Sequence, residues 1–160
     1  IDSFQNIYED KWLNMMKNKL GLFGEDKNDK KLINDLLDWM EKNNVDYTNT
    51  FCHLMDIKSN DDIYKETNFI KWTSRWKKRS ELNNSSKENQ MKLMKLNNPI
   101  VIPRNHKVEE ALVEADKGNL DKIMKLLNIL KKPYANQDIS SEYKLPAPKS
   151  SKKYQTFCGT

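Results

Sequence analysis

The chain has 160 residues with a net charge of +5, and 37% of its residues are hydrophobic while 32% are charged. This length allows one domain with a real core, and no apolar run approaches the roughly 18 residues that a membrane span needs. Two cysteines make no disulfide framework and no secretory leader is visible, so we expect a reducing, cytoplasmic compartment and no membrane partner.

The first half of the chain shows helical periodicity and almost no strand signal. Gly21 follows the first apolar series and is placed to end a helix. Asn28 or Asp29 can cap the second helix, and Asp46 precedes a short third one. The expected helices follow apolar positions within residues 4–20, 32–40, 51–55 and 63–76.

The densest basic run, residues 75–79, raises the question of nucleic-acid binding. It contains Trp76, but Trp72 lies four residues earlier on the same helix face. This spacing favours a tryptophan stripe packed on a core, with the basic residues on a solvated face, over a base-stacking platform. Acidic residues are also interleaved with basic ones, so we expect no nucleic-acid partner.

The last third of the chain predicts a helical hairpin. A short amphipathic turn with Met91 and Met94 is stopped before Pro99. Pro103 is placed to start a helix, residues 118–119 end it, and residues 131–133 close the next one. The apolar stripes of the two helices are Val108, Ala111, Leu112 and Ala115, then Leu120, Ile123, Met124, Leu127 and Leu130.

Beyond Tyr134 the sequence turns polar and gains prolines. We therefore predict an all-α fold, an irregular multi-helix domain over residues 1–133 that ends in the hairpin, followed by an extended tail over residues 134–160. The chain opens on Ile1 rather than Met, so we expect it to be cut from a longer protein.

Few residues offer chemistry. The only cysteines and histidines are Cys52, His53, His106 and Cys158, and none of them has the spacing of a structural zinc site, so no metal is expected. The four glycines stand singly, which excludes a phosphate-binding glycine loop. Cys52 lies among apolar residues and is predicted to be a packed hydrophobe.

Two segments keep more than one interpretation. Arg104, Asn105 and His106 follow an apolar stretch at a helix start, where they either cap the helix and make buried hydrogen bonds or dock another domain; caps are common there, which favours the structural role. Cys158 lies in a tail without apolar periodicity, so packing gives no reason for it. It is either part of an inert end or a thiol that is oxidised or paired.

Several of these segments together resemble one family. Residues 98–106, 108–112, 118–119, 128–134 and 154–160 look like the C-terminal end of the selenoprotein O (YdiU) family, and residues 19–23 and 46–51 are similar to its preceding segment. The resemblance covers almost the whole chain. One departure is Pro103, where many members carry an aliphatic residue.

The resemblance implies a kinase-like parent enzyme that transfers AMP from ATP to hydroxyl side chains of proteins. ATP and Mg or Mn would be bound outside this chain, so no catalytic, cofactor-binding or metal-binding residue is carried over. Cys158 would occupy the position of the family's selenocysteine, which is associated with redox control and pairs with a cysteine that also lies outside the chain. Arg104, Asn105 and His106 become candidates for contact with the N-terminal kinase-like domain.

The resemblance therefore makes residues 1–133 the helical C-terminal domain of a bacterial protein adenylyltransferase, with its redox cysteine in the tail. The expected partners are the kinase-like domain and the protein substrates of the parent enzyme. A non-catalytic redox-sensing or protein-interaction module remains the alternative.

Overall fold

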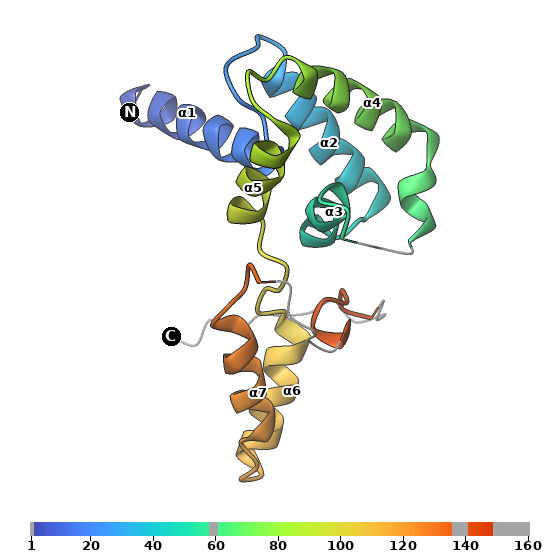
Figure 1. Cartoon of the computed structure of the whole chain (residues 1–160). Coiled ribbons are helices and arrows are strands. Elements are labelled where there is room, and N and C mark those ends of the chain that lie inside the picture. Colours follow the sequence, from blue (N-terminus) through green and yellow to red (C-terminus); the bar gives the residue numbers. More distant parts are fainter. Residues whose placement is uncertain (1, 58–60, 136–140, 149–160) are drawn as a thin grey trace. The chain divides into compact units, whose positions relative to one another are not determined.

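The computed structural model describes residues 2–57, 61–135 and 141–148, and every regular element within these ranges is helical, which confirms the all-α class (Figure 1). The α-helices are α1 (Asp2–Lys19), α2 (Asp29–Asn43), α3 (Tyr47–Leu54), α4 (Thr67–Glu81), α5 (Lys87–Asn97), α6 (Asn105–Asp116) and α7 (Asp121–Leu130). Two short 3-10 helices are η1 (Asp62–Lys65) and η2 (Ser141–Tyr143). No described helix combines the length and the apolar character that crossing a bilayer requires.

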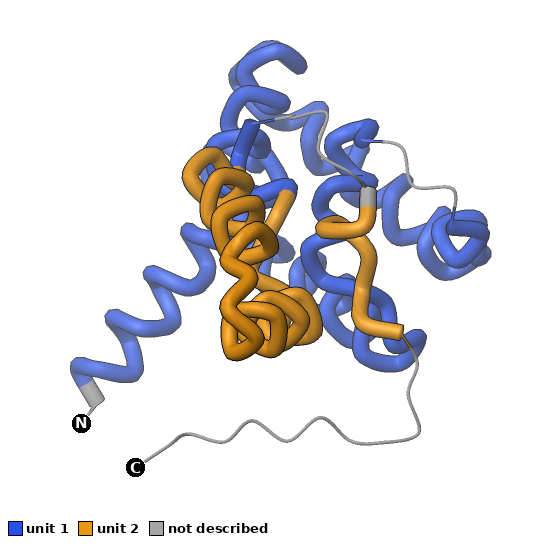
Figure 2. Tube along the Cα trace, turned by 90° about the horizontal axis from the view of Figure 1, so that it is seen from below, with its two compact units in different colours: residues 1–100, 134–136 blue, residues 101–133, 137–160 orange. Residues whose placement is uncertain are grey.

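The chain divides into two compact units (Figure 2). Unit 1 comprises residues 1–100 and 134–136 and holds α1 to α5, and unit 2 comprises residues 101–133 and 137–160 and holds α6, α7 and η2. Sequence analysis predicts a boundary after residue 133 between a helical domain and a tail. The two compact units are a division of another kind and do not test that boundary, so it stays a prediction.

Unit 1 is built around buried aromatic and aliphatic side chains. Helix α1 packs on α5 and α2, and α2 packs on α4. The indole N–H groups of Trp72 and Trp76 donate to the carbonyl oxygens of Leu32 and Leu20, at 2.8 and 2.9 Å. Both tryptophans are therefore buried with their polar groups satisfied, which confirms the predicted tryptophan stripe.

Helix ends in unit 1 follow the sequence signals in most places. Gly21 has φ +65, and the N–H of Leu22 donates to the carbonyl of Lys17 at 2.9 Å, so glycine closes α1 as predicted. Asp46 caps α3 by accepting from the Asn49 N–H at 2.8 Å. Asn28 holds the N-cap position of α2 without a capping bond from its side chain.

Two elements begin or end differently from the prediction. The expected short turn around Met94 is a full helix, α5, which Ser86 caps by accepting from the Asn89 N–H at 3.2 Å. Helix α6 begins at Asn105, two residues after Pro103, because Arg104 still has extended backbone angles (φ −74, ψ 128) and serves as the N-cap residue.

Unit 2 is the predicted hairpin, with α6 and α7 side by side (Figure 1). The buried residues of α6 and α7 are Ala111, Leu126 and Ile129. The predicted apolar stripe is wrong for Leu112, Leu120, Met124 and Leu127, which are about half exposed. The apolar residues of α7 cover one broad face, with Leu126 and Ile129 buried at one edge and Met124 and Leu127 exposed at the other, so the sequence period could not tell which part of the face packs on α6.

Candidate functional site

The segment that contains Cys158 lies outside the described residues, so its redox role stays a prediction. The described part of the predicted tail, residues 134–135 and 141–148, includes the 3-10 helix η2 and a buried tyrosine, Tyr143. The ammonium groups of Lys107 and Lys125 lie 5.9 and 5.3 Å from the centre of the Tyr143 ring. Because these lysines come from α6 and α7, the tyrosine anchors residues 141–145 on the hairpin.

Arg104 contributes to the same anchor. Its Nη2 donates to the backbone carbonyl of Lys144 at 2.9 Å, and its own carbonyl accepts from the N–H of Val108 at 3.0 Å. Lys125 and Glu142 form an ion pair at 3.1 Å across the same region. The Arg104 side chain thus makes a partly buried hydrogen bond, of the kind that the structural alternative expects.

The next two residues of that segment are placed differently. Asn105 is exposed at the first turn of α6, and His106 is half-buried. Contact of Arg104, Asn105 and His106 with another domain stays a prediction, and the two side chains with exposed surface are the ones available for it.

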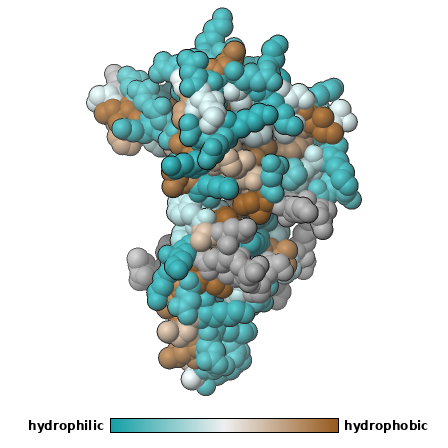
Figure 3. Space-filling model, viewed as in Figure 1, coloured by the Kyte–Doolittle hydropathy of each residue, from teal (hydrophilic) through white to brown (hydrophobic). Residues whose placement is uncertain are grey.

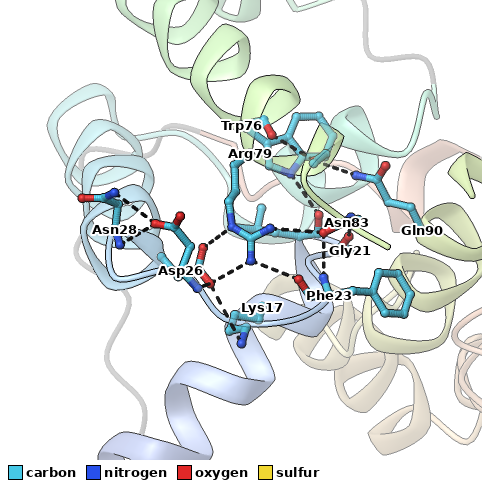
Figure 4. Close-up of polar contacts among 12 residues, drawn as sticks. Lys17, Gly21, Phe23, Asp26, Asn28, Trp76, Arg79, Asn83 and Gln90 are labelled. Atoms are coloured by element: carbon cyan, nitrogen blue, oxygen red, sulfur yellow. Dashed lines mark hydrogen bonds and ion pairs between the residues drawn. The ribbon is translucent and has the colours of Figure 1, made fainter. Parts of the chain in front are cut away.

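The most extensive polar network of unit 1 surrounds Arg79 (Figure 4). Arg79 lies on α4, and its Nε and Nη2 donate to the two carboxylate oxygens of Asp29, at 2.7 and 3.0 Å. Lys17 of α1 approaches the same carboxylate at 3.9 Å. Three helices therefore meet at one buried carboxylate, held by a bidentate, charge-assisted pair.

The remaining donors of Arg79 fix the loop between α1 and α2. Nη2 also donates to the Phe23 carbonyl at 3.0 Å, and Nη1 donates to the Asn83 side-chain oxygen at 3.2 Å. Asn83 in turn donates to the Gly21 carbonyl at 2.9 Å and accepts from the Phe23 N–H at 2.9 Å. The network satisfies a buried loop backbone, which is a structural role rather than a catalytic one.

Sequence analysis assigned the basic residues of the run 75–79 to a solvated face, and this is wrong for Arg79. Arg79 continues the spacing of Trp72 and Trp76 at three residues further on, so it lies on the buried side of α4. That spacing was the signal that could have identified it. Arg75, Lys77 and Lys78 are exposed as expected.

A second polar contact joins the ends of α1 and α5. Lys19 donates to the Asn97 carbonyl at 3.1 Å and to the Asn98 side-chain oxygen at 3.2 Å, and Asn98 returns a bond to the Lys19 carbonyl at 2.8 Å. The ammonium also lies 5.0 Å from the centre of the Phe51 ring. Burial lowers the pKa of Lys19.

Cys52 and His53 take structural positions on α3. Cys52 is buried and its thiol faces the Pro99 carbonyl at 3.9 Å, which confirms that it is a packed residue. His53 stacks on Tyr64 with ring centres 4.0 Å apart, and burial lowers the pKa of the imidazole. Over residues 2–57, 61–135 and 141–148, no group of three or more His, Cys, Asp or Glu side chains could hold a metal ion.

A surface groove lies along α2 and α4. Its lining residues are Asp35, Trp39, Asn68, Ile70, Lys71, Trp72, Ser74 and Arg75. Arg75 and Asp35 pair at 2.6 Å within it. The groove reaches the first turn of α4, where the Phe69 N–H donates to the Glu66 carboxylate at 3.3 Å, so a nucleotide phosphate there would meet a negative charge.

Comparison with known proteins decides the family. The family model described as "Protein adenylyltransferase SelO" matches residues 1–131. This chain belongs to the SelO family. The match includes every α-helix described above, from α1 through α7.

Individual relatives in the SelO family carry the name "Protein nucleotidyltransferase YdiU". The protein from Pelagibacter ubique is 50% identical over 162 aligned positions, that from Clostridium beijerinckii is 44% identical over 161, and that from Nitrosococcus oceani is 41% identical over 162. Each alignment covers 100% of this chain but 33% of the relative. The chain therefore spans about a third of the length of the curated relatives it matches.

Proposed function

We propose that this chain is the C-terminal helical part of a protein adenylyltransferase, which transfers AMP from ATP to hydroxyl side chains of proteins and releases pyrophosphate. The observation that carries the proposal is the alignment of the whole chain to a third of relatives named protein nucleotidyltransferase. The family match over residues 1–131 supports the same assignment. The parent protein would act in the bacterial cytoplasm, and its relatives are bacterial.

The residues present do not fit ATP or its Mg or Mn ion. Nucleotide phosphates need backbone N–H groups or cations converging on them, and kinase-like catalysis also needs acidic metal ligands. The four glycines of the chain stand singly, and its described residues hold no acidic cluster that could bind a metal. We therefore assign ATP and metal binding to the part of the protein outside this chain.

The role proposed for this C-terminal helical part is structural. Unit 1 ties three helices and a loop through the Arg79 network, and such fully bonded buried networks hold a single packing arrangement. A rigid unit of this kind is suited to support a kinase-like core. Asn105 and His106, with Arg104 behind them, are the proposed points of contact.

AMP transfer should therefore require the whole protein. We expect the full-length protein to transfer the label from ATP carrying a labelled α-phosphate to protein acceptors, and the 160-residue chain to bind no ATP. Saturable ATP binding with AMP transfer by the 160-residue chain would contradict the assignment of the nucleotide site. A full-length protein without AMP transfer would favour the non-catalytic interaction module.

The second part of the proposal concerns Cys158, which we assign to redox regulation of the parent enzyme. The thiolate is the reactive form of a cysteine, and access to it sets the rate of oxidation. Peptide mapping of the oxidised full-length protein should find Cys158 in a disulfide or in another oxidised form, with Cys52 as the buried internal control. Unmodified Cys158 under those conditions would rule out the redox role.

A further inference from the structure

Helix α1 is apolar on two opposite sides. Met16 and Leu20 face the core of unit 1 and are 1% and 0% exposed. Successive residues of an α-helix are rotated by about 100°, so Phe4, Ile7 and Met15 lie on the side opposite these two. The outward face is formed by Phe4, Ile7, Tyr8 and Met15, whose side chains are 73%, 59%, 59% and 44% exposed.

The outward face of α1 is continuous rather than scattered. Ile7 and Tyr8 follow Phe4 by three and four residues, and Met15 follows Tyr8 by seven, which places the four side chains in one stripe along the helix. Lys11, which is also exposed, lies at the centre of this stripe. Figure 3 shows hydrophobic surface near the N-terminal end of α1. In Figure 1 this end of the helix extends away from the other helices of unit 1.

The first half of α1 lacks internal support. Residues 3–11 are all exposed, and the described interactions of this half with the rest of unit 1 include one ion pair, Glu9 with Lys30 at 2.8 Å. A surface ion pair adds little stability, and most helical stability in proteins comes from packing an apolar face. The outward face is the apolar face that this half of the helix has to pack.

The alignments with the relatives indicate which part of the protein supplies a surface to cover the outward face of α1. This chain spans 33% of their length, so about two thirds of each relative lies outside the aligned region. We propose that the outward face of α1 docks on that remaining part of the same polypeptide, through an apolar surface that places a carboxylate opposite Lys11. The inference rests on the proposed function in one respect, namely that this chain is a piece of a longer SelO-family protein.

Charge argues against a second copy of the chain as the occupant. Symmetric pairing of two identical faces brings the same central residue from each copy together. Here that residue is Lys11, so two like charges would meet inside an apolar contact, which is unfavourable. A different surface with a carboxylate at that point avoids this cost.

Cysteine labelling of the full-length protein tests the proposal. Ile7→Cys places a thiol on the outward face, and Asn6→Cys, its matched control, places one on the neighbouring exposed position that points away from that face. Maleimide labelling is followed by peptide mass spectrometry, which separates these sites from Cys52 and Cys158. We expect Ile7→Cys to react at least about tenfold more slowly than Asn6→Cys in native protein and equally fast in urea, since a covered site reacts only on local opening.

Equal labelling of the two sites in native protein would overturn the proposal. Protection of Ile7→Cys that disappears on dilution would also overturn it, because the occupant would then be a second copy. Adding Lys11→Glu should abolish the protection whereas Lys11→Met should keep it, and protection that survives Lys11→Glu would overturn the opposing carboxylate. Protection in a full-length protein without AMP transfer would contradict the proposed function and leave the docking surface standing.

Discussion

The Arg79 guanidinium uses a bidentate bond to neutralise Asp29, a carboxylate that is 2% exposed. Arg79→Ala leaves this buried charge with Lys17 at 3.9 Å as its remaining cation. We expect unit 1 to lose about 3–5 kcal/mol, the usual cost of removing one partner of a buried pair. Urea unfolding followed by tryptophan fluorescence measures the loss, since all four tryptophans lie in unit 1.

Arg75→Ala is the matched control for this substitution. Arg75 lies on the same helix and pairs with Asp35 at 2.6 Å, but its side chain is 51% exposed. Surface pairs contribute below about 1 kcal/mol. Equal losses from the two substitutions would show that burial does not decide the strength of the Arg79 pair.

His53 makes unit 1 sensitive to mild acid. Burial against Tyr64 lowers the pKa of His53 from its ordinary 6.5, so the unfolded chain binds a proton at a higher pH than the folded chain. The free energy of unfolding should therefore fall as the pH drops through 6.5 toward the lower folded pKa. His53→Phe keeps the ring stack and should flatten this part of the stability profile, measured by urea unfolding between about pH 7.5 and 5. An unchanged slope would mean that another group titrates there.

At the scale of elements, Gly21 decides how closely α5 can approach the end of α1. A Cβ at this position would lie 2.6 Å from Gln90 Cγ and 2.9 Å from Met94 Cγ, and φ is +65. Gly24 has a similar φ of +67 with nothing within 4 Å of an added Cβ. Gly24→Ala should therefore cost about 1–2 kcal/mol from backbone strain alone, and Gly21→Ala should cost more. Equal midpoints of thermal unfolding would exclude a steric contribution from α5.

Tyr143 is the anchor of residues 141–145 on the hairpin. Tyr143→Ala removes the ring that Lys107 and Lys125 contact, whereas Tyr143→Phe keeps an aromatic face for both ammonium groups. We expect amide hydrogen exchange within residues 142–145 to become faster in Tyr143→Ala and to change little in Tyr143→Phe. Fast exchange in the unsubstituted chain would show that the anchor contributes little.

At the scale of the whole molecule, large apolar side chains are exposed to solvent on both units. They include Phe4, Ile7, Tyr8 and Met15 in unit 1, and Leu112, Val113, Leu120, Met124 and Leu127 in unit 2. The 160-residue chain should therefore bind a hydrophobic dye such as ANS while its helical circular dichroism is intact. Ile7→Glu should lower the dye signal and Asn6→Glu should not. A chain that binds no dye would contradict the exposure of these faces.

The sequence predicted the helices and several of their ends because these depend on local signals. Glycine after an apolar series closed α1, and Asp46 capped α3 as expected. It did not predict the bidentate bond of Arg79 to Asp29, because each residue alone fits a solvated surface and their pairing depends on how α2 and α4 pack. Tyr143 was missed because it lies in a polar segment without periodicity.

In the candidate site, too, local features could be predicted from the sequence and contacts between distant segments could not. The position of Arg104 at the start of a helix could be predicted from neighbouring residues, but its bond to Lys144 joins segments 40 residues apart. The resemblance to the SelO family was recognisable because its motifs are contiguous in sequence. The outward face of α1 needed the structure, since its apolar series alone does not say which members face a core.

The pairing of Arg79 with Asp29 also has a consequence for synthesis on the ribosome. The two residues are 50 positions apart, and the Asn83 bond to the Gly21 carbonyl spans 62. At about 5–20 residues per second, Asp29 is made roughly 3–10 s before its arginine. During that interval the Asp29 carboxylate and the loop between α1 and α2 are without the bonds from Arg79 and Asn83, so this network forms only after α4 has emerged.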